Sequence, residues 1–144
     1  MNVPITERLA AGSEVRAWED TIPFRYEYTA GVAGEKFLRG LRDGEILAGL
    51  CPSCGLTSLP LRMYCVDCYA EVTKSVRVRP AGVVRALARG ARTFAYVEFD
   101  GVKGGLVHTL IGSARVGSRV VVRFRPKRQR VGALSDVLGF ERSG

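Results

Sequence analysis

The sequence predicts a mainly β protein with N-terminal helices, and two observations support this prediction. Four cysteines form two CxxC pairs within residues 51–68, and the chain has no others. After them, five short segments rich in β-branched and aromatic residues are separated by Gly, Asp or Pro. We therefore expect a rubredoxin-like zinc ribbon at residues 48–78 and a five-stranded OB-fold barrel at residues 79–144. Residues 1–47 should form an N-terminal docking segment of helical and extended structure.

The N-terminal segment begins with a short amphipathic pattern. Residues 3–20 predict one or two short helices with a single apolar side, formed by Ile5, Leu9, Val15 and Trp18. Such a segment is too short to form a core of its own, so it docks either on the rest of the chain or on a partner. The aromatic residues of 24–28 alternate with charged ones as in an extended segment, and a helix is then expected at Glu35–Arg42, ending at Gly44.

The cysteines have the spacing of a metal site. In a CxxC pair the backbone turns so that both sulfurs face one point, and Gly55 can complete the first turn with a positive φ. Within residues 56–64, between the two pairs, Leu59, Leu61 and Met63 alternate with the residues that follow them, as in a hairpin. Four thiolates fill a tetrahedral shell and leave no position for water or substrate, so we expect one structural zinc per chain. A rubredoxin-like iron centre and a dithiol redox pair are the alternatives. The ligands are Cys51, Cys54, Cys65 and Cys68.

The barrel is predicted from five strand-like segments, of which residues 119–125 show the clearest alternation. Its apolar residues point to one face, the core, and its arginines point to the other. The predicted strands are residues 82–88, 93–99, 106–111, 119–125 and 133–140.

No catalytic set can be assembled from the sequence. His108 is the single histidine, and every cysteine is assigned to the metal, so neither a Ser/His/Asp nor a Cys/His arrangement is available. Glu98 and Asp100 fit the polar face and turn of a hairpin. The residues alone therefore indicate a binding protein and not an enzyme.

The charge of the chain favours an anionic ligand. The formal net charge is +8, and residues 51–144 alone carry about +10. Seven basic and no acidic residues lie between Arg115 and Arg130, which makes nucleic acid an alternative ligand, although the same run also fits a solvated hairpin. Against nucleic acid, Glu98 shares a strand face with Phe94 and Tyr96, where phosphates would have to run.

The sequence also predicts where the protein acts. No apolar run approaches the roughly 20 residues that span a bilayer, and residues 1–20 do not have the pattern of a secretory signal. We therefore expect a cytoplasmic protein without a membrane partner. In a reducing compartment, paired cysteines bind metal far more often than they form disulfides.

Together these motifs resemble a known family. The stretch "YEYTAGVAGEKFLRGLRDGEILAGLCPSCGLTSLPLRMYCVDCY" (residues 26–69), followed by a five-stranded barrel, resembles the acyl-CoA-associated zinc-ribbon and OB-fold proteins called domain of unknown function 35 (DUF35), and residues 28–69 are the most specific part. The helix that leads into the ribbon is similar to the archaeal branch. Two departures are Leu61, where the family often has a second proline, and Tyr69, where a glycine would turn more easily.

The resemblance implies a function that the residues alone do not give. Members of the family are non-catalytic partners of thiolase-superfamily enzymes. The archaeal type is implied to join acetoacetyl-CoA thiolase to hydroxymethylglutaryl-CoA synthase in the mevalonate pathway, so that acetoacetyl-CoA passes between them. The same resemblance implies that the four cysteines bind metal and that the barrel helps to hold CoA or an acyl-CoA. Cations of the barrel would bind the CoA phosphates, and the candidates are Arg123, Arg125, Lys127 and Arg128.

Overall fold

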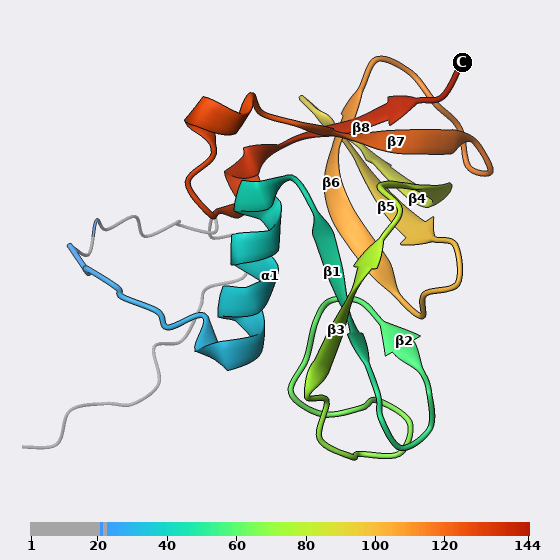
Figure 1. The fold of residues 1–144 in the computed structure, drawn as a ribbon. Coiled ribbons are helices and arrows are strands. Elements are labelled where there is room, and N and C mark those ends of the chain that lie inside the picture. Colours follow the sequence, from blue (N-terminus) through green and yellow to red (C-terminus); the bar gives the residue numbers. More distant parts are fainter. Residues whose placement is uncertain (1–20, 22) are drawn as a thin grey trace, which may run out of the picture.

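A computed structural model describes residue 21 and residues 23–144, and Figure 1 shows its fold. One helix packs beside a small three-stranded sheet, and a closed five-stranded barrel follows. This architecture confirms the predicted fold class of a ribbon followed by a five-stranded barrel. The helices predicted within residues 3–20 lie outside the described residues. In the part of the chain that the structure describes, no helix is long and apolar enough to cross a membrane.

Helix α1 begins earlier than its sequence pattern suggests. It spans Gly31–Asp43, whereas the prediction began at Glu35. Glycine is a poor helix former, which is why the pattern excluded the first turn. In the structure Ala33 packs against the core, and this contact favours the additional turn.

The other end of α1 agrees with the sequence. Phe37 and Leu41 are buried against the core and Leu38 is half-buried, so the predicted apolar stripe is the packing face. The helix stops at Gly44, whose φ of 80° is left-handed and whose N–H donates to the Leu41 carbonyl at 3.0 Å.

The ribbon sheet has the order β2-β1-β3, with β1 antiparallel to both neighbours. The hairpin expected across residues 56–64 is wrong, because only Thr57–Ser58 of this segment form a strand. The chain then leaves the sheet to meet the barrel, and Pro60 has no N–H for a ladder. The strands are β1 (Ile46–Leu50), β2 (Thr57–Ser58) and β3 (Lys74–Val78).

The barrel closes in the order β4-β5-β6-β8-β7, with β7 returning to pair with β4. Strands β6 and β8 are parallel and all other pairs are antiparallel. Along β5, Ala95, Val97 and Phe99 are buried while the intervening residues face outward, as their alternation predicts. The strands are β4 (Ala81–Arg89), β5 (Thr93–Phe99), β6 (Gly105–Ile111), β7 (Arg119–Phe124) and β8 (Val137–Arg142).

The last predicted strand begins four residues late, at Val137 in place of residue 133. Short 3-10 helices at Lys127–Gln129 (η1) and Leu134–Asp136 (η2) precede it. The fully buried Asp136 carboxylate accepts backbone N–H bonds from residues 131, 132 and 133 at 2.9, 2.7 and 3.2 Å. These bonds hold the chain in a turn where its residue types suggested a strand.

Ribbon and barrel are joined by backbone hydrogen bonds at one residue of the β5–β6 loop. The Lys103 carbonyl accepts from the Leu59 N–H, and the Lys103 N–H donates to the Thr57 carbonyl, both at 2.9 Å. Gly104 has a φ of 87°, and a Cβ there would overlap the Leu59 carbonyl. Around this joint a single hydrophobic cluster contains buried residues of the helix, the ribbon and the barrel.

The contact between the ribbon and the β5–β6 loop predicts that substitutions of two glycines in this loop lower the free energy of unfolding by different amounts. Gly101 and Gly104 both have a positive φ, but a Cβ at Gly101 would meet nothing within 4 Å. We expect Gly101→Ala to lower the free energy of unfolding by about 1 kcal/mol through backbone strain alone. Gly104→Ala should lower it by about 2–4 kcal/mol, because the overlap with Leu59 adds to the strain. Urea denaturation of the metal-loaded proteins measures both values, and equal losses would contradict the close approach.

Candidate functional site

The four cysteines converge at the end of the ribbon, in the two turns that follow β1 and precede β3. Their sulfur atoms all lie within 4.8 Å of one another. The nearest pairs join the two turns: Cys51 to Cys68 at 3.5 Å, and Cys54 to Cys65 at 3.6 Å. Four sulfurs about 2.3 Å from one zinc ion lie about 3.8 Å apart in a tetrahedron. The spacing of the cluster therefore fits a single metal ion.

Both turns are built in the same way. The N–H of the first cysteine donates to the carbonyl five residues later, from Cys51 to Leu56 and from Cys65 to Ala70, at 2.9 Å in each case. A left-handed residue follows each second cysteine. It is Gly55 in the first turn, with a φ of 75°, as predicted.

In the second turn the left-handed residue is Tyr69. Its φ is 59°, and it is the one non-glycine with a positive φ in the described part of the chain. A bulky residue in this region is strained. Its side chain is 79% exposed, so the ring makes few contacts within the protein.

The turns also stabilise thiolates. The Cys54 N–H donates to the Cys51 sulfur at 3.5 Å, and this bond, together with the Ser53 N–H and the neighbouring sulfurs, lowers the pKa of Cys51 to about 6. Backbone N–H groups of Cys68 and Asp67 lower the pKa of Cys65 in the same way. The first sulfur of each pair is thus prepared to bind a cation, since the thiolate is the form that ligates metal.

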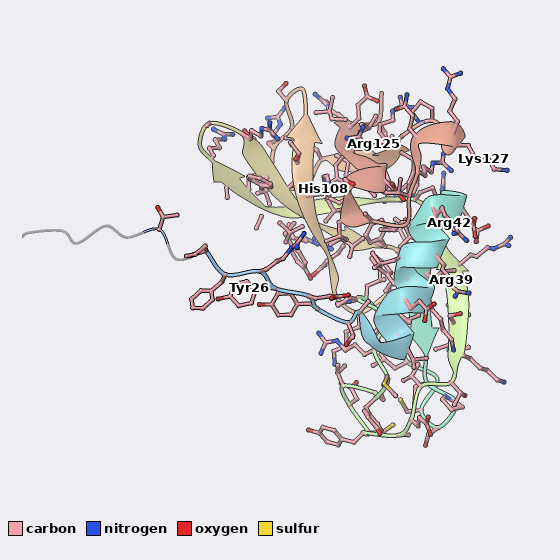
Figure 2. The ribbon with its side chains drawn as sticks, turned by 90° about the vertical axis from the view of Figure 1, so that its left-hand side faces the viewer. Tyr26, Arg39, Arg42, His108, Arg125 and Lys127 are labelled. Carbon is pink, nitrogen blue, oxygen red and sulfur yellow. The ribbon has the colours of Figure 1, made fainter. Side chains whose placement is uncertain are left out.

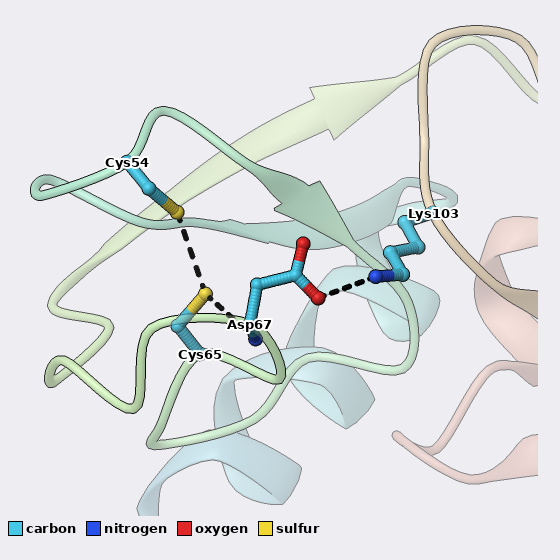
Figure 3. Close-up of polar contacts among 4 residues, drawn as sticks. All are labelled: Cys54, Cys65, Asp67 and Lys103. Atoms are coloured by element: carbon cyan, nitrogen blue, oxygen red, sulfur yellow. Dashed lines mark hydrogen bonds and ion pairs between the residues drawn. The ribbon is translucent and has the colours of Figure 1, made fainter.

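The surroundings of the cluster fit a closed structural site. Cys51 and Cys65 are buried, while Cys54 and Cys68 are exposed. The carboxylate near the cluster, Asp67, is ion-paired with Lys103 of the β5–β6 loop (Figure 3). The cysteines lie in turns and not at the start of α1, so no helix N-terminus within the described residues is placed to activate a redox thiol. The donor set therefore fits zinc bound by four thiolates, and that ion would hold the two turns together.

The four barrel cations expected at a CoA site lie in different surroundings. Arg123 on β7 is ion-paired with Glu141 of β8. The half-buried Arg125 donates through Nε to the Ser135 carbonyl at 2.6 Å. Lys127 and Arg128 are exposed on η1.

The segment that carries η1 packs across the C-terminal end of α1. A Cβ at Gly132 would contact the backbone of Leu38 and the Cβ of Arg42, and Arg130 lies against Gly44. Figure 2 shows Arg42 and Lys127 at this same end of the helix. Sequence reasoning missed Arg42, because nothing in the spacing of residues 42 and 132 indicates that they lie close together. Its position in the last turn of a helix was the single available signal.

Two other surface arginines have carboxylate partners. Arg85 pairs with Glu98 at 2.8 Å, and Arg119 pairs with Asp100 at 2.5 Å. These pairs lie on the outer face of the barrel, where Phe94 is also exposed. The positive charge of the barrel is therefore partly neutralised on this face.

His108 has the contacts of a structural residue. Its Nδ1 accepts the Thr109 N–H at 2.9 Å, so its Nε2 carries the proton and lies 3.3 Å from the Leu134 carbonyl. Burial lowers its pKa, and its ring lies edge-on to Phe140. No carboxylate contacts it among the described residues, so it resembles a packed side chain and not a general base.

Comparisons with solved structures identify proteins of the same fold. One is a protein of unknown function from the DUF35 family of Sulfolobus solfataricus, 25% identical, with a TM-score of 0.63, covering 82% of this chain and 90% of that one. Another is named the Ltp2-ChsH2(DUF35) aldolase, 17% identical, with a TM-score of 0.62, covering 81% of this chain and 98% of that one. No protein-family model matches the sequence, and no curated protein does.

The metal centre predicts how much zinc the protein contains and how zinc binding depends on pH. Protein prepared without added metal should contain one zinc per chain, measured by mass spectrometry of the metal. Cys54→Ser should lose the zinc, whereas Ser53→Ala in the same turn should keep it. Because protons compete with the metal for thiolates and bound zinc lowers the pKa of Cys51 further than the backbone N–H groups do, zinc should be retained at neutral pH and released only well below pH 6. A strong visible iron spectrum would contradict the assignment.

Proposed function

We propose that this protein is a member of the DUF35 family and acts as a non-catalytic accessory subunit of an acyl-CoA-processing enzyme. The observation that carries the proposal is the shared fold with two DUF35 proteins, one of them part of a named aldolase. The site chemistry supports it, because the cysteines fit a structural metal and His108 has no catalytic partner in the described residues. Four cysteines arranged as metal ligands also suit a reducing compartment, which supports a cytoplasmic location.

The specific partners that we propose are acetoacetyl-CoA thiolase and hydroxymethylglutaryl-CoA synthase. The resemblance of residues 28–69 to the archaeal branch supports this pair. Joining the two enzymes has a physical advantage, since acetoacetyl-CoA forms unfavourably and its direct transfer to the second enzyme draws the first reaction forward. In this role the metal would fix the shape of the ribbon, and the barrel would contribute to a shared CoA site.

For the CoA site, the surroundings of the cations favour the end of α1. CoA carries a 3′-phosphate and a pyrophosphate, which are bound well by two or three convergent cations. Lys127 and Arg128 are exposed on η1, Figure 2 shows Lys127 and Arg42 at the same end of α1, and none of these three cations has an ion pair with another described residue. Arg123 would first have to leave Glu141, and Arg125 would contribute only its remaining guanidinium N–H groups.

Nucleic acid is the competing ligand, and the charge pattern of the barrel weakens this alternative. Arg119 and Arg123, two of the seven basic residues between 115 and 130, are ion-paired with carboxylates. Glu98 faces outward beside Phe94 and Tyr96, as the sequence predicted. A phosphate backbone that followed this face would meet the carboxylates of Glu98 and Asp100.

The proposal predicts what the protein retains from a lysate of its own source. At moderate salt, tagged protein should co-purify with thiolase-superfamily subunits, identified by mass spectrometry. The retained complex should convert acetyl-CoA to hydroxymethylglutaryl-CoA without releasing free acetoacetyl-CoA. Recovery of nucleic acid alone, lost steeply as salt rises, would instead support the alternative. Recovery of neither would contradict both functions.

Substitutions of the barrel cations should weaken CoA binding to different degrees. Lys127→Ala combined with Arg128→Ala should weaken CoA binding by the assembled complex about tenfold or more, because each charge-assisted hydrogen bond contributes about 1.5–3 kcal/mol. Arg123→Ala should change it less, because this arginine already binds Glu141. Isothermal titration with CoA measures both. A larger loss for Arg123→Ala would place the phosphates on β7.

A further inference from the structure

A small hollow lies between α1 and the ribbon, on a side of the molecule that the proposed CoA site does not use. Its volume is about 130 Å³. Val32 and Ala33 of the helix line one side, and Leu61, Met63 and Val72 of the ribbon line the other. Leu61 is buried and Val72 is half-buried, so the floor is apolar.

The size of the hollow limits what it can hold. Pockets for cofactors and drug-sized ligands measure about 300–1,000 Å³, so CoA does not fit. An apolar cavity of about 150 Å³ holds one benzene ring. The hollow is therefore suited to one large apolar side chain, which is how a protein partner is commonly anchored.

The rim of the hollow is positively charged. Lys36 of α1 and Lys74 of β3 both line it, and Glu71 is the acidic residue beside them. Neither lysine is ion-paired with another residue in the described part of the chain. A side chain that enters between them would be favoured if carboxylates flanked it.

The apolar surface continues from the hollow to the metal turn. Met63 also lines a second, open hollow of about 480 Å³, together with Tyr64 and Tyr69. These three side chains are 42%, 59% and 79% exposed. Tyr69 is the tyrosine with the left-handed backbone conformation. A partner that covers its ring would bury an exposed aromatic surface.

We propose that these two hollows form the docking surface for a partner-protein segment that inserts one apolar side chain beside Lys36 and Lys74 and carries carboxylates next to it. Met63, Tyr64 and Tyr69 extend the contact past the inserted side chain. The inference rests on the proposed role as an accessory subunit, because it supplies the place where the partner enzyme binds. It does not depend on which acyl-CoA enzyme that partner is.

The first test uses photo-crosslinking at matched positions. Benzoylphenylalanine replaces Val32 at the hollow or Val116 in the β6–β7 loop, which are 58% and 59% exposed. After irradiation of the full-length protein in lysate of its own source, crosslinked peptides are identified by mass spectrometry. The Val32 probe should capture the partner at an apolar residue with Asp or Glu within a few positions, at least tenfold more than the Val116 probe. Capture of a second copy of this chain, or of a segment without carboxylates, would overturn the proposal.

The second test reverses charge. Lys36→Glu combined with Lys74→Glu should reduce retention of the partner at least tenfold. Arg89→Glu combined with Arg92→Glu, the same charge change on the exposed β4–β5 turn, should leave it unchanged. Zinc content and thermal midpoint establish that both variants fold. Equal losses would show a general charge effect and would overturn the docking surface.

The outcomes separate this inference from the proposed function. If an acyl-CoA enzyme co-purifies but the Val32 probe does not crosslink to it, the docking surface is wrong and the accessory role stands. If the probe captures a carboxylate-flanked apolar segment of a protein with no acyl-CoA chemistry, the surface stands and the accessory role is wrong. Tyr69→Gly is a further discriminator: it should raise the thermal midpoint by removing strain, yet weaken partner retention.

Discussion

The rest of the structure depends on the backbone pairing of Lys103 with residues 57–59. This contact fixes the ribbon against the barrel where the two segments exchange two hydrogen bonds. The same residue reaches the second metal turn through its side chain, which pairs with Asp67. Because one hydrophobic cluster surrounds the joint, the ribbon, α1 and the barrel are positioned relative to one another by packing as well as by hydrogen bonds. The two cysteine turns of the ribbon are thereby held in a fixed position relative to the barrel.

Local patterns in the sequence predicted local features of the fold. The CxxC spacing identified the four converging sulfurs, and the alternation of residues 93–99 predicted a strand that the structure reproduces with the same bounds. What the sequence did not show depends on contacts between distant segments. Nothing local indicates that Arg123 meets Glu141, or that Arg42 lies beside the η1 segment. The roles of individual barrel cations could therefore not be assigned before their partners were known.

Asp136 shows how a single buried side chain can override a local pattern. Residues 133–140 read as one strand, but the carboxylate gathers three N–H groups and turns the chain. Burial alone would raise the pKa of Asp136, yet these bonds lower it below its ordinary 3.8. Its ionised form thus stabilises the fold above that pH, and the contribution is lost as the pH falls through the lowered value. The segment that carries Lys127 and Arg128 is held in place by this carboxylate.

Closure of the barrel also restricts how another chain can attach by its backbone. Each of the five barrel strands has a hydrogen-bonded neighbour on both sides, and β2 has β1 on one side and Lys103 on the other. Among the described strands, β3 alone has an outer edge with neither a strand nor an isolated bridge beside it, and it carries Lys74 and Arg77. Lysine and arginine on a strand edge oppose sheet extension between identical chains, because each copy repels the next. The charges on this edge of β3 therefore oppose self-aggregation through it, whereas an acidic chain could still pair there.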